Sequence, residues 1–270
     1  MSAVFDGPVE LIRAIFHIAA TEEKSTALNL VCVCKAVREW IMPIIYETVE
    51  LDNPSAVQFE KMLTMPSSSS VACLVRQLRV TCLPNVDLLS SRCRAVQAMT
   101  IANHDMRHLR RLELPSLTHL TIGGSLRHTH LSADMAPALA TVTHLRFTHD
   151  VPRLPDNIPT IMPHLTHFWC YYRLSKKTQH RELEQCVTRV MRAPRLRVAC
   201  VQTQDGGGGG VLEMLGMDDL RLVAVSNADI VSETRREGCW IVAEAKIARA
   251  QCELVTVKAR LRGKNGNQIK

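Results

Sequence analysis

The sequence predicts an α/β protein in which a short motif of three helices precedes an irregular solenoid of repeats, built on a parallel sheet and closed by a C-terminal capping helix. Near the N-terminus, apolar residues recur at three- and four-residue spacing, which is typical of amphipathic helices. From Val75 onward, one short apolar template returns every 21 to 31 residues, which is typical of a solenoid. With 46% hydrophobic and 22% charged residues, the composition is that of a globular protein.

The first helix is expected to begin around Pro8, since proline and the acidic Glu10 are both favoured in a first turn. The polar segment from Thr21 to Ser25 should end this helix. One apolar face runs along it through residues three or four positions apart, namely Leu11, Ile12, Ile15, Phe16 and Ala19.

A second helix should start at Thr26 with Ser25 as its N-cap. It is apolar on nearly every side from Leu28 to Val33, so we expect it to be buried from several directions. Pro43 should interrupt it or start a new turn, because proline lacks the N–H that a helix interior uses. The β-branched run after Pro43, IIYETVEL, predicts a strand.

Cys32 and Cys34 form a C-x-C pair that suggests a metal or redox site at first sight. Two positions apart on a helix, however, side chains point about 200° apart and cannot hold one ion. A closed zinc site needs a matching second pair of ligands, and the sequence has neither that pair nor a C-x-x-C. We therefore interpret these two cysteines as core residues and expect no metal there.

Four segments of this region resemble the F-box motif: PVELI at Pro8, LNL at Leu28, VCK at Val33 and PIIY at Pro43. The continuation YETVELDNPSAVQFEKML is similar to the linker strand and helix of F-box-like proteins expanded in mushroom-forming (basidiomycete) fungi. The chain departs from that pattern in two places, at Gly7, where the family usually has leucine, and at Val37, where it often has tryptophan.

In that family, as the resemblance implies, the three helices dock on the small adaptor subunit of a cullin–RING ubiquitin ligase, and the rest of the chain selects a target protein. The alternative is that the segment from Pro8 to Tyr46 only caps the repeats, because helices this short need a packing partner. Within the motif of residues 1–48, the resemblance implies these adaptor-binding positions: Pro8, Leu11, Ile12, Ile15, Leu28, Leu30, Val33 and Pro43.

The repeat template has apolar residues at its first, fourth and sixth positions. A period of about 20–29 residues with L-x-x-L-x-L is the signature of leucine-rich repeats, in which each repeat adds one short strand. LRRLEL at Leu109 is out of phase, and we interpret it as a connecting segment. The copies in phase are VRQLRV (Val75), VQAMTI (Val96), LTHLTI (Leu117), VTHLRF (Val142), LTHFWC (Leu165), LRVACV (Leu196) and LRLVAV (Leu220).

These patterns divide the chain into four parts, with the repeats at residues 75–227. Residues 49–74 form a linker with a strand, a helix and the serine run Ser67–Ser70. Residues 228–270 should form a C-terminal cap, in which a helix beginning around Trp240, Ile241 and Ile247 covers the open end of the last repeat, followed by a basic tail.

The glycine run Gly206–Gly210 lacks the G-K-[ST] ending of a phosphate-binding loop. We expect it to be a flexible insertion loop within the repeats.

The outward face of the repeat strands is the expected binding site for a target protein. Alternate residues of a strand point away from the core, and adjacent strands lie about 4.8 Å apart, so equivalent positions form rows. Aromatic residues and arginine are enriched at interaction hot spots. The interpretation that Trp169 merely packs against a loop stays open. The expected target-binding residues are His119, Thr121, His144, Arg146, His167, Trp169 and Tyr171.

The histidine row does not predict a metal site, because side chains on neighbouring parallel strands point the same way rather than converging. No nucleophile-elbow, zinc-protease or dinucleotide-binding motif is present, so we predict neither an enzyme nor a cofactor.

The net charge of +7 leaves room for an acidic partner, but the basic residues are scattered and only 4% of residues are aromatic, which argues against nucleic acid. No apolar run reaches the roughly 20 residues that span a bilayer, and the N-terminus lacks the basic region of a signal peptide. We expect a chain of the cytoplasm or nucleus with reduced thiols.

The leading hypothesis is therefore a substrate-receptor (F-box) subunit of a ubiquitin ligase, without catalytic activity of its own. The alternative is a leucine-rich-repeat interaction module with a degenerate F-box that binds no adaptor.

Overall fold

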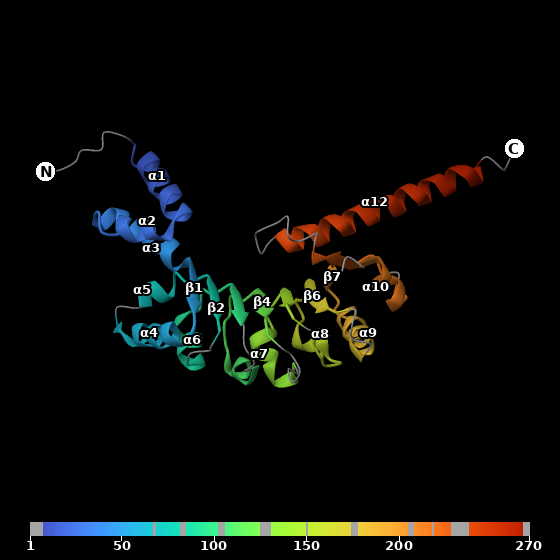
Figure 1. Cartoon of the computed structure of the whole chain (residues 1–270), viewed down its shortest axis with the longest axis horizontal. Coiled ribbons are helices and arrows are strands. Elements are labelled where there is room, and N and C mark those ends of the chain that lie inside the picture. Colours follow the sequence, from blue (N-terminus) through green and yellow to red (C-terminus); the bar gives the residue numbers. More distant parts are fainter. Residues whose placement is uncertain are drawn as a thin grey trace. The chain divides into compact units, whose positions relative to one another are not determined.

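The computed structural model describes residues 8–66, 69–81, 85–101, 106–124, 131–149, 151–173, 178–204, 208–217, 219–227 and 238–266 (Figure 1). Its helices are α1 (Val9–Glu22), α2 (Lys24–Leu30), α3 (Lys35–Glu47), α4 (Asn53–Thr64), α5 (Ser69–Ala72), α6 (Val86–Arg92), α7 (Ala136–Leu139), α8 (Ile158–Ile161), α9 (Thr178–Val190), α10 (Gly208–Leu215) and α12 (Gly238–Gly266). Its strands are β1 (Thr48–Leu51), β2 (Gln77–Val80), β3 (Ala98–Ile101), β4 (His119–Ile122), β5 (His144–Phe147), β6 (His167–Tyr172), β7 (Val198–Thr203) and β8 (Leu222–Ser226).

The strands form one eight-stranded sheet in sequence order, from β1 to β8. The β1–β2, β2–β3, β5–β6, β6–β7 and β7–β8 pairs are parallel. Among the described residues, the connections between strands range from short turns of helix such as α7 to the 13 residues of α9. Strand order in the sheet follows chain order, as the repeat template predicts. The α/β class and the parallel sheet are thus confirmed. The chain divides into two compact units, Met1–His119 and Leu120–Lys270.

The first unit begins with three helices that pack on one another, as predicted. Their shared core consists of Ala20 from α1, Ala27 from α2, and Val37 and Ile41 from α3. Small alanines at the contact points allow the short helices to approach closely. Val37, which stands where the F-box family often has tryptophan, is buried in this core.

The boundaries of α2 and α3 differ from the prediction. Ser25 is not an N-cap: α2 begins at Lys24 with Glu23 before it, and the Ser25 hydroxyl donates to the Glu23 carboxylate at 2.5 Å. Helix α2 then ends at Leu30, and a turn precedes α3.

Pro43 does not interrupt a helix, because α3 runs through it to Glu47. Proline removes one backbone hydrogen bond, but the residues around it pack into the three-helix core. Ile41 is fully buried there, and Ile44 and Ile45 are packed against it. Tertiary packing therefore outweighs the local penalty.

The strand predicted over IIYETVEL is right only in its second half, because residues 44–47 continue α3. The second half is β1, the first strand of the sheet, which pairs with β2 in the register Leu51 to Val80. A capping box starts α4 directly after β1. The Asp52 carboxylate accepts a hydrogen bond from the Ser55 backbone N–H, and the Ser55 hydroxyl oxygen accepts one from the Asp52 backbone N–H. Of the serine run, Ser67 and Ser68 lie outside the described residues, and Ser69 begins α5.

The repeat template is confirmed in LTHLTI. Leu117, Leu120 and Ile122 are buried, whereas His119 is exposed and Thr121 is half-buried. LRRLEL is a connecting segment, as predicted, with a 3-10 helix over Met106–Arg111 rather than a strand.

The glycine run is only in part what the sequence predicts. Gly208 begins α10, and Gly206 and Gly207 lie outside the described residues. Glycine is a poor helix former, but α10 buries Val211 completely, and that burial holds the helix in place.

The predicted C-terminal helix exists as α12, but its position differs from a cap beyond the last strand. The first turns of α12 pack on the outward side chains of the last strands, through Cys239, Ala243 and Ile247, which join a cluster with Trp169 and Val225. Strands β6, β7 and β8 are consequently buried on both faces, whereas β2, β3 and β5 alternate between buried and half-buried residues.

Candidate interaction surfaces

The first candidate surface lies on the N-terminal helices, where large apolar side chains are exposed. Helix α1 has two apolar sides: Phe16 and Ala20 face the three-helix core, and Leu11, Ile15 and Ile18 lie along a separate exposed stripe. Leu11 and Ile15 are 58% and 57% exposed. Such side chains are unusual on a surface that has no partner.

Most of the expected adaptor-binding residues belong to this surface. Pro8, Leu11, Ile15, Leu28, Val33 and Pro43 are exposed, while Ile12 is half-buried and Leu30 packs into the three-helix core. Two exposed residues were missed, Val9 and Ile18. The spacing from Leu11 to Ile15 to Ile18 continues one helical stripe, and that pattern could have identified Ile18.

Cys32 and Cys34 are exposed, so their interpretation as core residues was wrong. The prediction assumed one continuous helix, but Cys32 lies in the turn after α2, and Cys34 is the N-cap of α3. The turn lifts both side chains away from the core. The same turn leaves Val33 60% exposed, so α2 is less buried than its composition predicts.

The second candidate surface is the outward row of β5 and β6. The strand register pairs His144 with His167 and Arg146 with Trp169, as the repeat alignment predicts. The two imidazole rings are stacked, with centroids 4.1 Å apart, and the Arg146 guanidinium lies 5.2 Å from the Trp169 ring centroid. The preceding threonines orient the rings, since Thr143 Oγ1 lies 2.8 Å from His144 Nδ1 and Thr166 Oγ1 lies 2.8 Å from His167 Nδ1.

This row is covered by α12 instead of being open. The Trp240 ring makes edge contacts with the rings of His144, His167 and Trp169, each at a centroid distance of 5.4 Å. Glu244, four residues later on the same side of the helix, places Oε1 2.9 Å from His167 Nε2.

Trp169 is therefore no exposed anchor, and that part of the prediction was wrong. Its exposed fraction is 0%, and its indole N–H donates to Gln202 Oε1 at 2.9 Å. The open alternative, that Trp169 packs within the chain, is closer to the structure, although the partner is a helix and not a loop.

The other expected target-binding residues lie on β4 and at the far end of β6. His119 is exposed at the start of β4, and Thr121 is half-buried in the same strand. Tyr171 is half-buried in β6, with the guanidinium of Arg173 5.8 Å from its ring centroid.

Arg146 is the least satisfied polar group beneath α12. Its Nη1 lies 3.4 Å from Cys239 Sγ, and its Nε is buried without a hydrogen-bond acceptor among the described residues. A thiol is a weak acceptor, so within the described part of the chain this guanidinium has no strong acceptor beneath α12.

The thiols next to this row are chemically quiet. Burial raises the pKa of Cys200 well above its ordinary value, and nearby Cys170 and Cys239 raise it further. Within the described residues, no three histidine, cysteine or acidic side chains are grouped so that they could hold a metal ion.

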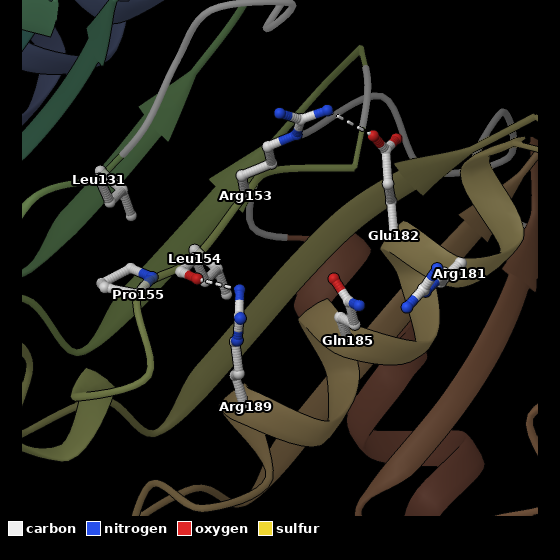
Figure 2. A pocket seen from close by; sticks show the side chains of 8 residues that line it. All are labelled: Leu131, Arg153, Leu154, Pro155, Arg181, Glu182, Gln185 and Arg189. Carbon is white, nitrogen blue, oxygen red and sulfur yellow. Dashed lines mark hydrogen bonds and ion pairs between the residues drawn. The ribbon is translucent and has the colours of Figure 1, made fainter.

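A third feature is a hollow of about 590 Å³ beside α9, lined by Leu131, Arg153, Leu154, Pro155, Arg181, Glu182, Gln185 and Arg189 (Figure 2). Two of its three guanidiniums have partners: Arg153 binds Glu182 at 3.0 Å, and Arg189 donates to the Leu154 carbonyl at 2.5 Å. The hollow therefore offers little unpaired positive charge.

No protein-family model, curated protein or solved structure matches this chain. Among the described helices, none is long and apolar enough to cross a bilayer.

Proposed function

We propose that this chain is a substrate-receptor subunit of a cullin–RING ubiquitin ligase, which binds the adaptor subunit through α1–α3 and a target protein through the repeat unit. The observation that supports the proposal is the exposed apolar surface of α1–α3, together with the F-box-like segments that supply it. In this role the chain positions a target for ubiquitin transfer by other subunits and catalyses no step itself. The proposal places it in the cytoplasm or nucleus.

The physical basis is the second apolar side of α1. A helix that needed only to cap the repeats would bury one stripe and leave the other polar. Here Leu11, Ile15 and Ile18 add a stripe that the three-helix core does not use. Burying such side chains against a partner contributes about 1.5–3 kcal/mol each, enough to drive association.

The test changes this stripe in the full-length chain. Leu11→Asp with Ile15→Asp should weaken binding to a recombinant adaptor by roughly 100-fold or more, since two apolar contacts are replaced by buried charges. Binding is measured by isothermal titration calorimetry. Both residues are exposed, so the circular dichroism spectrum and the unfolding transition should stay unchanged.

The matched control is Arg13→Asp with His17→Asp, which introduces the same residues at exposed positions of the same helix. It should leave adaptor binding within about threefold of wild type, as surface changes away from an interface usually do. If the Leu11/Ile15 variant still binds the adaptor, or the unmodified chain does not bind it, the substrate-receptor proposal is wrong. The alternative is then a repeat-based interaction module with a degenerate F-box.

A further inference from the structure

We propose that the outward face of β5–β8 is a binding site for a partner helix that carries an acidic residue directly before an aromatic residue and a second acidic residue four positions after the aromatic. In this proposal α12 is the resident occupant of the site, and the partner helix displaces it. This names a partner class for the repeat unit and does not depend on adaptor binding.

The contacts of α12 define what the site recognises. One aromatic side chain, Trp240, meets three rings of the strand face, and one carboxylate, Glu244, meets His167. Small or aliphatic side chains fill the remaining space, because Cys239 and Ala243 are buried. Residues three and four apart share one side of a helix, so these features belong to a single helical face.

Arg146 indicates that α12 is not the best occupant. A guanidinium has five N–H donors, yet Arg146 meets only the Cys239 sulfur, at 3.4 Å, and the Trp169 ring, and its buried Nε lacks an acceptor among the described residues. A carboxylate at the position of Cys239 would accept charge-assisted, bidentate hydrogen bonds from it. The face is thus better matched to an acidic–aromatic helix than to its own α12.

The connection within one chain explains how a mismatched helix holds the site. Because α12 belongs to the same chain as the strand face, it competes for that face at an effective concentration of roughly millimolar and needs little intrinsic affinity. A partner helix with the missing carboxylate has the higher intrinsic affinity, and it replaces α12 when its concentration is sufficient.

The test uses fluorescein-labelled peptides with the sequence of residues 236–253, in which Cys252 is replaced by serine, and the full-length chain. One peptide carries Cys239→Asp and its matched control carries Cys239→Ser, which has similar size and no charge. Fluorescence anisotropy should show the Asp peptide binding about 10-fold more tightly than the Ser peptide. Adding Trp240→Ala to the Asp peptide should weaken binding roughly 30-fold.

Two changes in the chain locate the site. In the Arg146→Gln chain the two peptides should bind equally, because the guanidinium is gone. In the Trp240→Ala chain both should bind at least about 10-fold more tightly than in wild type, because the tethered competitor is weakened. Hydrogen exchange in residues 238–253 of the wild-type chain should rise when the Asp peptide binds.

The proposal is overturned if the Asp and Ser peptides bind the wild-type chain equally, if neither binds the Trp240→Ala chain, or if exchange in α12 stays unchanged while the Asp peptide is bound. If Arg146→Gln prevents folding, the comparison of the Asp and Ser peptides on the wild-type chain and the hydrogen-exchange measurement still test the proposal. No adaptor is present in these assays, so failure here leaves the adaptor proposal standing, and the reverse also holds.

Discussion

At the residue scale, the thiols of this chain fall into two chemically distinct groups. None of the nine described cysteines is in a disulfide bond, but their surroundings differ. Cys32 and Cys34 are exposed at the turn between α2 and α3. Burial raises the pKa of Cys93 to about 12, with a further contribution from nearby Cys73. Only the thiolate reacts, so exposure and pKa together separate the two groups.

Alkylation at pH 7.5 should therefore modify Cys32 and Cys34 within minutes and leave Cys93 and Cys200 intact in the folded chain, as measured by peptide mass spectrometry. Unfolding in guanidinium should make all four equally reactive, because burial is lost. Equal reactivity in the native chain would contradict the placement of these thiols. If the adaptor binds α1–α3, it should also slow the modification of Cys34, which follows the exposed Val33.

At the element scale, α12 holds its place through one aromatic side chain and a narrow apolar contact. Cys239, Ala243 and Ile247 are buried, whereas Ile241 is 59% exposed on the opposite side. Trp240 contributes three ring contacts with β5 and β6. The two neighbours in sequence, Trp240 and Ile241, thus separate the buried and exposed sides of the helix.

Trp240→Ala should lower the free energy of unfolding by about 2 kcal/mol, because edge-to-face aromatic pairs are each worth roughly 0.5–1.5 kcal/mol beyond their area burial. Ile241→Ala, one position away, should change it by less than about 0.5 kcal/mol. Chemical denaturation of the two variants measures the difference. Equal effects would mean that α12 does not rest on the strand face through Trp240.

At the scale of the whole molecule, the strands fall into two classes of burial. The described β2, β3 and β5 alternate between buried and half-buried residues along the chain, whereas β6 and β7 are buried at every position but one and β8 at three of its five positions. Parallel strands that are covered on both faces read as continuous apolar runs. HFWCYY, VACVQT and LVAVS each contain such a run, FWCYY, VACV and LVAV, whereas QLRV, AMTI and HLRF are interrupted by a polar residue.

Template positions should therefore differ in their contribution to stability. Leu145, fully buried in β5, should cost about 3 kcal/mol on mutation to alanine, since a cavity remains. Leu220, at the first template position of the last repeat, is 39% exposed, so its change to alanine should cost less than about 1 kcal/mol. Urea unfolding of both variants measures this. Similar costs for the two variants would contradict the exposed placement of Leu220 at the start of the last template.

From the sequence alone, apolar spacing predicted the first helix, the parallel sheet and the inward positions of LTHLTI, because spacing is a local property that each helix or strand carries with it. It merged α2 and α3 into one helix, and only the resemblance to the F-box motif implied three helices. Tertiary contacts determine three further outcomes: α3 continues through Pro43, Cys32 and Cys34 are exposed, and α12 lies over His167 and Trp169. These outcomes depend on which helix or strand packs against which, and the spacing of apolar residues within one element does not contain that information. The outward face of β6 was expected to be an open binding surface, and that expectation was wrong because the covering helix lies about 70 residues further along the chain, where spacing alone could not identify it.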